Sequence, residues 1–283
     1  MNAFMNQSDS FKHSNRSLLK PQNQNHAFTL TELAVVIVTI AVLALLVLPA
    51  LAGVANKGGR AQCANNLRQI GVASMVYATE YRDWLPVCTV GGFNVAGVNN
   101  LGFMDYTYYV AFGTANAFVP TNAPYSSFTD LGRLYHVGLA GNGSIFYCPD
   151  QWGTTVLSAN NYLPLLTTDS SGTVRSSYAF NPRIVNATNA IQNYARRYQK
   201  TSDLTPHNLF SVDFFGSPLG DGVLAGVPSH VRERGWNVLF TDGSVQFSQN
   251  AQACNLIQTF AVLENYQSNM QEDQILNCLE LDH

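Results

Sequence analysis

Three aspartates in glycine-rich surroundings are the side chains of this sequence best suited to hold a metal ion. Asp213, Asp221 and Asp242 offer carboxylate oxygens, the hard ligands that calcium prefers. Their spacing is not that of an EF-hand loop, and aspartate is also a common turn residue. The sequence therefore leaves two interpretations, a calcium site or ordinary turns, and it indicates no other cofactor.

Histidine and serine residues form no familiar catalytic pattern. His136, His207 and His230 stand apart from one another, and no G-x-S-x-G, H-E-x-x-H or phosphate-loop motif is present. Ser17 and Lys20 match S-x-x-K, but they lie in the polar N-terminal segment. We therefore expect that the chain is not an enzyme.

The cysteines indicate disulfides rather than a metal site. No C-x-x-C pair occurs, and no histidine stands at metal-ligand spacing from a cysteine. In an exported protein an odd number of cysteines implies up to two bridges and one free thiol. Spacing does not determine the pairing of the five candidates, which are Cys63, Cys88, Cys148, Cys254 and Cys278.

The composition narrows the class of protein. Charged residues make up 12% of the 283 residues, against roughly 25% in soluble domains. The formal net charge is -3 and no basic stripe occurs, which argues against nucleic acid as a partner. The polar residues are mainly Asn, Gln, Ser, Thr and Tyr, a profile that suits a secreted or cell-surface protein.

The N-terminal region combines a polar leader with a long apolar segment. Residues 1–27 carry three basic residues against one acid and do not belong to the folded protein. Between Phe28 and Asn56 the only charge is Glu32, and residues 33–48 are almost entirely apolar. A stretch of roughly 20 such residues can span a bilayer as a helix. Three Lys/Arg residues precede it and three follow, so charge does not set its orientation; we take its N-terminus as cytoplasmic.

A second helical segment follows the apolar one and is amphipathic. Its small and apolar residues recur at spacings of 3 and 4, which places them on one face of a helix. Asp83 to Pro86 end the pattern, because proline cannot continue a helix. We predict one helix over residues 28–83, with a membrane part (28–55) and an amphipathic part (60–83), kinked at Pro49 and loosened at Gly58-Gly59. The stripe is Cys63, Leu67, Ile70, Ser74, Tyr77 and Tyr81.

The remaining residues, 84–283, predict a globular C-terminal domain. Asp242-Gly243 between alternating apolar runs predicts a β-hairpin with a two-residue type I′ turn, which sets Phe240 opposite Val245. The expected fold class is α+β, a long N-terminal helix packed on a mainly antiparallel sheet. The other expected elements are strands or ordered loops at 106–112 and 116–119, strands at 144–147 and 177–181, a helix at 131–139, and helical structure over 251–281.

The junction between leader and helix resembles the processing site of type IV prepilins and type II secretion pseudopilins. Those proteins are cut directly before a Phe. Thr-Leu-x-Glu and then a long apolar helix follow that Phe, and this chain has the sequence Ala27-Phe28-Thr29-Leu30-Thr31-Glu32. Pro49 lies 21 residues after Phe28, where these helices often carry a proline. The chain departs from the pattern at Ala27, since the family prefers Gly there.

The resemblance implies a structural filament subunit. A prepilin peptidase would cut between Ala27 and Phe28 and methylate the new N-terminus, and the helix, with Glu32 and Pro49, would assemble into a type IV pilus-like or pseudopilus-like filament. The implied partners are identical or related pilin subunits, the peptidase, an inner-membrane assembly platform and, before assembly, membrane lipid. The implied location is the bacterial inner membrane with a periplasmic C-terminal domain, and then a periplasmic or surface filament.

Glu32 has a defined role in such filaments. Its carboxylate is thought to pair with the N-terminal amine of a neighbouring subunit, here on Phe28, which neutralises two buried charges and sets the register of the helices. The other interpretation is that Glu32 lies near the membrane surface and reaches water.

Further pieces resemble a large group of bacterial prepilin-type proteins with big C-terminal domains. The group is named for a histidine, nine residues and then Asp-Gly. Here eleven residues separate His230 from Asp242-Gly243, so we expect the hairpin but not a contact between His230 and Asp242. The matching pieces are residues 62–71, Tyr77, Leu85-Pro86, 145–149, 176–181 and 237–240.

Two alternatives remain open from the sequence. Ala50-Leu51-Ala52 fits a signal-peptide cleavage pattern, which would make Gly53 the first residue of a secreted protein. A membrane-anchored, adhesin-like module that does not polymerise is the alternative function, because aromatic residues between 103 and 112 could form a binding surface as well as a core.

Overall fold

The computed structural model describes residues 28–86, 108–111, 128–150, 159–166, 174–183, 197–214, 230, 232–262 and 269–282. The predicted leader, Ala27, Cys88, the strand at 116–119 and most of the segment 88–129 therefore lie outside the described residues. The chain divides into two compact units, Met1–Leu51 and Ala52–His283.

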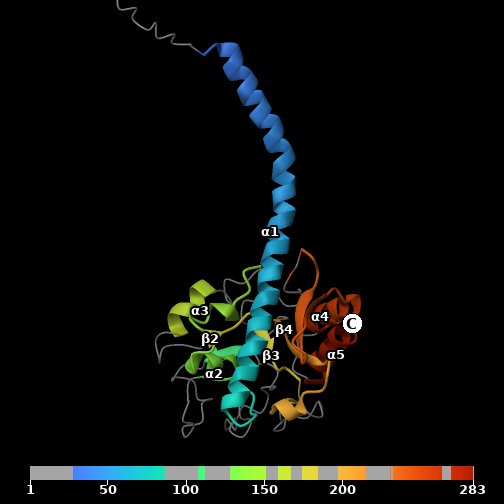
Figure 1. Cartoon of the computed structure of the whole chain (residues 1–283). Helices are drawn as coiled ribbons and strands as arrows, with labels where there is room; N and C mark the ends of the chain where they lie inside the picture. Colours follow the sequence, from blue (N-terminus) through green and yellow to red (C-terminus); the bar gives the residue numbers. More distant parts are fainter. Residues whose placement is uncertain are drawn as a thin grey trace, which may run out of the picture. The chain divides into compact units, whose positions relative to one another are not determined.

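The described elements confirm an α+β fold (Figure 1). The helices are α1 (Leu30–Glu80), α2 (Leu131–His136), α3 (Ala159–Leu166), α4 (Ala251–Val262) and α5 (Asn269–Glu280), with short 3₁₀ turns η2 (Ser144–Phe146) and η3 (Thr201–Asp203). The strands are β1 (Tyr109–Ala111), β2 (Val174–Arg175), β3 (Tyr178–Phe180), β4 (Leu209–Asp213), β5 (Trp236–Phe240) and β6 (Val245–Ser248).

Helix α1 belongs to both units and matches the predicted long helix closely. It stays helical through Gly58-Gly59, where we expected it to loosen. A Cβ atom on Gly59 would lie 2.7 Å from Cβ of Asp150, so the missing side chain allows a close approach rather than a break. Pro49 also lies within α1, and its side chain is outside the described part.

The predicted amphipathic stripe of α1 is confirmed. Cys63, Leu67 and Ile70 are fully buried, Ser74 is buried with them, and Tyr77 and Tyr81 line the same core. The neighbouring sheet comes close to this helix, because a Cβ atom on Gly71 would lie only 3.1 Å from Leu239. Small residues in the stripe thus let helix and sheet pack tightly.

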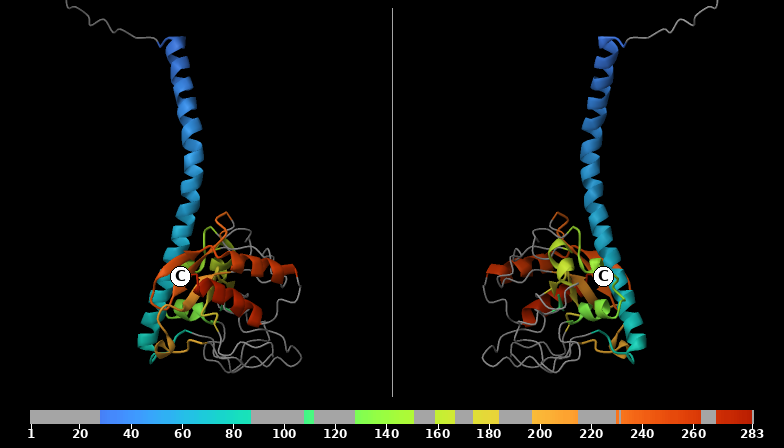
Figure 2. Two further views of the ribbon diagram at one scale, coloured as in Figure 1. Left: turned by 90° about the vertical axis from the view of Figure 1, so that its right-hand side faces the viewer. Right: turned by 90° about the vertical axis from the view of Figure 1, so that its left-hand side faces the viewer.

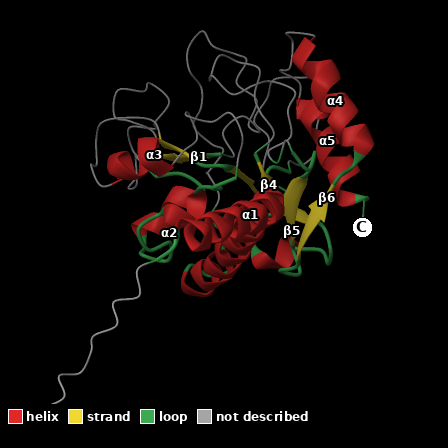
Figure 3. Cartoon of the chain, turned by 90° about the horizontal axis from the view of Figure 1, so that it is seen from above, coloured by secondary structure: helices red, strands yellow, loops and turns green. Residues whose placement is uncertain are grey.

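A four-stranded antiparallel sheet, in the order β3-β4-β5-β6, separates two apolar clusters. On one face Leu239 packs with Leu67 and Ile70 of α1. On the other face Trp236 and Val238, its alternate neighbours along β5, pack with residues of α4 and α5. Figure 3 shows α1 and the pair α4–α5 on opposite sides of β5 and β6. A separate pair, β1 and β2, is also antiparallel.

Buried charge attaches α5 to the rest of its unit. The Arg183 side chain is 3% exposed and forms ion pairs with Asp273 and Glu280 and a hydrogen bond with Asn277, all on α5. Helices α4 and α5 pack against each other (Figure 2). Separation of α5 from Arg183 would leave a buried charge without a partner, which is costly. These contacts therefore hold α5 against the segment after β3.

The predicted hairpin is present, but its register was wrong by one residue. Leu239 rather than Phe240 is opposite Val245. Phe240 instead accepts a hydrogen bond from the N–H of Gly243 and donates one to Ser244, which closes a three-residue loop with Gly243 at a φ of 84°. Asp242 accepts hydrogen bonds from the backbone and hydroxyl of Ser244 and favours this loop over the two-residue turn.

The strand predicted at 144–147 was also wrong. Ser144–Phe146 forms the 3₁₀ turn η2, because Gly143 adopts a φ of 82° and accepts a hydrogen bond from Phe146 N–H. The Asn142 side chain accepts a further bond from Ser144 N–H. This apolar run buries Phe146 within a turn. The spacing of apolar residues alone does not distinguish such a turn from a short strand.

Candidate functional site

The N-terminal half of α1 is an exposed apolar helix. Leu30–Val47 has a mean hydropathy of 2.8, none of it is buried, and it is long and apolar enough to cross a membrane. Phe28, which directly precedes the helix, is 80% exposed. Ala27, the other residue of the predicted cleavage site, lies outside the described residues.

Glu32 has a structural role that the sequence analysis missed. Its carboxylate accepts hydrogen bonds from the backbone N–H (2.9 Å) and the hydroxyl (2.7 Å) of Thr29, while the Thr29 hydroxyl accepts one from Glu32 N–H (3.2 Å). This reciprocal pair is a capping box, and its sequence signal is Thr-x-x-Glu. Glu32 therefore stabilises the N-terminal end of α1, independently of any role of its charge in assembly.

A disulfide joins α1 to the segment after η2. Cys63 and Cys148, 85 residues apart, are bonded with their Cα atoms 4.9 Å apart. Among the described cysteines, Cys254 and Cys278 are free thiols, and burial raises the pKa of both. Cys88 lies outside the described residues, and the part of the chain that the structure describes contains one of the bridges, at most two, that the sequence predicted.

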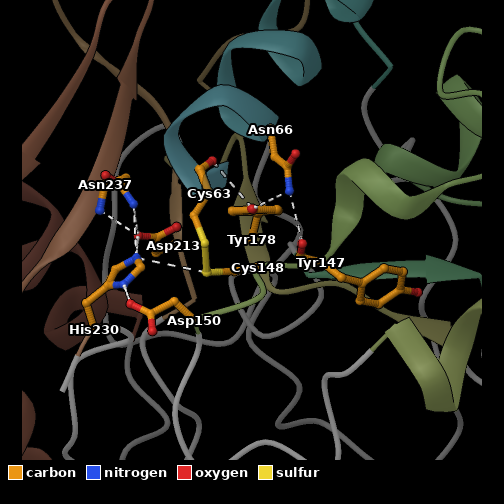
Figure 4. The surroundings of a disulfide bond; sticks show 9 residues. All are labelled: Cys63, Asn66, Tyr147, Cys148, Asp150, Tyr178, Asp213, His230 and Asn237. Atoms are coloured by element: carbon orange, nitrogen blue, oxygen red, sulfur yellow. Dashed lines mark hydrogen bonds and ion pairs between the residues drawn. A yellow bond between two sulfur atoms is a disulfide. The ribbon is translucent and has the colours of Figure 1, made fainter. Parts of the chain in front are cut away.

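Polar contacts beside the disulfide bind three distant segments together (Figure 4). The Asn66 side chain donates to Tyr147 O (3.0 Å) and to the Tyr178 hydroxyl (3.2 Å). The Tyr178 hydroxyl in turn donates to Cys63 O (3.5 Å). Burial, and next the charge of Asp213, raise the pKa of Tyr178 well above its ordinary value, so this phenol stays a donor.

His230 lies on the other side of the disulfide, between two carboxylates (Figure 4). Its ring is 1% exposed, with Nδ1 3.0 Å from Asp150 Oδ2, Nε2 3.0 Å from Asp213 Oδ2 and Nε2 3.9 Å from Cys148 Sγ. Burial lowers the pKa of His230, but the hydrogen bonds and charges of Asp213 and Asp150 outweigh it and raise the pKa overall. Each ring nitrogen thus has a carboxylate to which it can donate, and Asn237 Nδ2 also lies 3.0 Å from Nε2.

Asp213 is part of this buried network and not of an open calcium loop. It is fully buried, and one of its oxygens accepts hydrogen bonds from the backbone and the side chain of Asn237. Asp213 and Asn237 meet because β4 and β5 are adjacent antiparallel strands. His230 is held beside them by its backbone hydrogen bonds with Gly235, which directly precedes β5.

Asp242 lies elsewhere and faces a different histidine. It is exposed in the β5–β6 loop, where Oδ2 is 3.1 Å from His207 Nδ1. The hydrogen bonds from the hydroxyl and backbone of Ser244, and then that of His207, lower the pKa of Asp242 to about 2. His230 does not face Asp242. This agrees with our expectation from the spacing of eleven residues, which departs from the nine of the family pattern.

The structure does not bring the predicted calcium ligands together. Asp213 ends β4 while Asp242 follows the far end of β5, so about 13 Å of antiparallel strand separates them. Asp221 lies outside the described residues. The two described carboxylates cannot share an ion, and calcium binding by either one stays a prediction.

Among the described residues, the cluster closest to a metal site is Cys63, Cys148 and His230, whose ligand atoms lie within 4.8 Å of one another. The two sulfurs are bonded to each other and offer no thiolate, which is the form that binds metal. The arrangement is therefore that of a disulfide packed against a buried histidine.

The raised pKa of the buried His230 ring predicts a pH-dependent stability. Because the pKa of His230 is raised in the folded state, its contribution is complete below the unfolded value of 6.5 and is lost as the pH rises through the folded pKa. The free energy of unfolding should fall by up to about 1.4 kcal/mol per pH unit in that interval. Urea unfolding of the full chain in detergent between pH 6 and 9 measures this slope. His230→Gln should flatten it, and an equal slope in that variant would contradict the assignment.

Comparison with known proteins identifies one family. Residues 58–208, more than half of the chain, match the family described as a protein of unknown function, DUF1559. No curated protein and no solved structure is similar enough to count as a match. The matched segment contains the amphipathic half of α1, the disulfide, Asn66 and Tyr178, whereas His230 and the hairpin follow it.

Proposed function

We propose that this chain, which belongs to the DUF1559 family, is a pilin-like structural subunit that is anchored in the membrane by α1 and assembled through it. A prepilin peptidase would cut between Ala27 and Phe28, and the mature subunit would join a type IV pilus-like or pseudopilus-like filament. Its partners would be related subunits and an inner-membrane assembly platform, with the C-terminal domain on the periplasmic side.

The single observation that carries the proposal is the exposed apolar half of α1. Leu30–Val47 has no buried residue, and its only charge, Glu32, stands five residues into the chain that cleavage before Phe28 would leave. A lone apolar helix in water would expose many large side chains, so it must enter a membrane or pack with other helices. The second half of α1 is held within the globular unit, since its stripe is buried there.

The proposal predicts where the chain is processed. Purification of the protein from its native membrane, followed by N-terminal sequencing and intact mass, should give Phe28 as the first residue, with the mass of one methyl group added. A first residue of Gly53 would instead identify a signal peptide and would exclude the proposal. Phe28→Asp is a suitable control because the altered residue lies at the cleavage site itself.

The exposed apolar helix Leu30–Val47 is also compatible with a second candidate function. A membrane-anchored surface-binding module that never polymerises would use the same helix as a simple anchor. Electron microscopy of sheared surface material separates the two: filaments in the wild type that are lost in Phe28→Asp support the subunit, and no filaments in either strain support the module.

A further inference from the structure

Side chains of the types that bind zinc meet at the disulfide, although they come from distant parts of the chain (Figure 4). The ligand atoms of Cys63, Cys148 and His230 lie within 4.8 Å of one another, and all three residues are buried. His230 Nε2 lies 3.9 Å from Cys148 Sγ, close to the roughly 3.6 Å that separates a nitrogen and a sulfur bound to one tetrahedral zinc ion. The histidine is therefore already placed for a metal ion that the two sulfurs would share.

Asp150 orients the ring of His230. Its Oδ2 lies 3.0 Å from Nδ1 of the ring. Histidines that bind a metal almost always donate their second ring N–H to a carboxylate, a carbonyl or water, which fixes the tautomer and leaves the other nitrogen for the metal. Asp150 itself is held close to α1, because a Cβ atom on Gly59 would lie 2.7 Å from its Cβ. The ring thus has a carboxylate partner on the nitrogen that does not face Cys148.

Asp213 places a second, fully buried carboxylate beside the same ring. Its Oδ2 lies 3.0 Å from His230 Nε2 and accepts hydrogen bonds from Asn237. Its Oδ1 is also buried and has no hydrogen-bond partner among the described residues. Native proteins leave few buried polar atoms unsatisfied, and a cation bound beside His230 would satisfy this one. The Asn237 amide, which lies 3.0 Å from Nε2, would give way to the ion.

We propose that, once the Cys63–Cys148 bond is reduced, this cluster binds one zinc ion through Cys63, Cys148, His230 and Asp213. Thiolate, imidazole and carboxylate are the ligands that zinc takes in tetrahedral protein sites. A dithiol gives two electrons and two protons to the disulfide, which leaves two cysteine thiols and the disulfide of the reductant. Zinc then replaces the two thiol protons, and the proton of Nε2 where the ring is charged, and these protons pass to the solvent.

Zinc and the disulfide would join the same two segments. The cysteines are thiols when the chain is made, so a reduced state precedes the bond. Two sulfurs on one tetrahedral zinc ion lie roughly 3.8 Å apart, a separation that rotation of the two side chains can give while the Cα atoms stay 4.9 Å apart. In the reduced chain the ion would therefore connect α1 to the segment after η2. The inference does not depend on whether the chain polymerises.

Cobalt is the probe of the site, because its spectrum reports both thiolate ligands and tetrahedral geometry. The full chain in detergent is reduced with a phosphine, kept free of oxygen at about pH 8, where protons compete less for the ligands, and titrated with Co²⁺ and then with Zn²⁺. We expect a thiolate-to-cobalt band in the near ultraviolet and strong visible bands that reach their maximum at about one equivalent. Zinc should remove these bands, because it binds such sites more tightly than cobalt. The oxidised chain lacks the two thiolates and should show neither.

Variants of the reduced chain locate the ion. Asp150→Ala keeps every ligand and should lower the affinity for zinc by about 10–100-fold. Cys148→Ser and His230→Gln each remove a ligand and should lower it by about a hundredfold or more, since a ligand contributes more than its hydrogen-bond partner. The double variant Cys254→Ser/Cys278→Ser removes the free thiols of the described residues, and as the matched control it should bind like the wild type.

Thermal unfolding gives a second measurement that a purely structural disulfide would not affect. Zinc should raise the unfolding midpoint of the reduced wild type and leave that of Cys148→Ser unchanged. Where reduction by itself unfolds the chain, zinc should restore the circular dichroism of the folded state in the wild type but not in Cys148→Ser. A zinc response that is equal in the two proteins would contradict the site.

The absence of a thiolate-to-cobalt band in the reduced wild type would overturn the proposal. Bands that Cys148→Ser keeps and Cys254→Ser/Cys278→Ser loses would also overturn it, because the ion would then be bound by the free thiols. Asp213→Asn tests the fourth ligand, and an affinity equal to that of the wild type would overturn the assignment of Asp213 and give its position to water.

Discussion

Replacement of both Cys63 and Cys148 by alanine is expected to lower the free energy of unfolding by about 4–5 kcal/mol, since the bond closes a loop of 85 residues in the unfolded chain. In the folded state the same bond joins the buried stripe of α1 to the segment after η2. A loss of this size is a large share of the stability of a typical domain.

Urea unfolding of the full chain in detergent measures the effect, with and without a dithiol reductant. The reductant should destabilise the wild type to about the level of the double variant and should not affect that variant further. Cys278→Ala removes a free, partly exposed thiol and is the matched control. A wild type whose unfolding midpoint does not respond to full reduction would contradict the prediction.

Glu32→Gln is expected to abolish filament assembly and to leave processing at Phe28 intact. Glutamine can still accept the hydrogen bonds from Thr29, because capping boxes use either Glu or Gln. The variant therefore keeps the cap and removes the charge, and under the proposed function the neighbouring N-terminal amine loses its partner.

Thr29→Ala is the complementary variant, since it removes the cap and keeps the charge. Assembly should survive in Thr29→Ala and fail in Glu32→Gln, as counted by filament yield in sheared material and by the fraction of protein with Phe28 as its first residue. The opposite result would mean that Glu32 acts as a helix cap alone, and that filaments, if present, do not depend on its charge.

The long helix could be predicted from the sequence because its signals are local. An uncharged apolar run of bilayer length, a change to a spacing of 3 and 4, and a proline that ends the pattern each depend on residues close together in the chain. The buried stripe from Cys63 to Tyr81 and the antiparallel strands around Asp242-Gly243 were predicted correctly for the same reason. The capping box of Thr29 and Glu32 was equally local, and its Thr-x-x-Glu signal was available.

Errors arose where several conformations satisfy the same pattern. The hairpin register depended on whether Asp242-Gly243 formed a two-residue or a three-residue loop, and the hydrogen bonds of Asp242 to Ser244 favoured the longer one. At residues 144–147 an apolar run could have been a strand, but the left-handed Gly143 made it a turn.

Only the tertiary structure decided which distant residues meet. The sequence by itself determined an exposed apolar helix, its amphipathic continuation and the α+β class. It did not determine that Cys148 pairs with Cys63, that His230 lies between Asp150 and Asp213, or that Asp213 and Asp242 are apart. The physical reason is that these contacts depend on the order of strands in the sheet and on the path of the chain between elements, which residue type and local spacing do not encode.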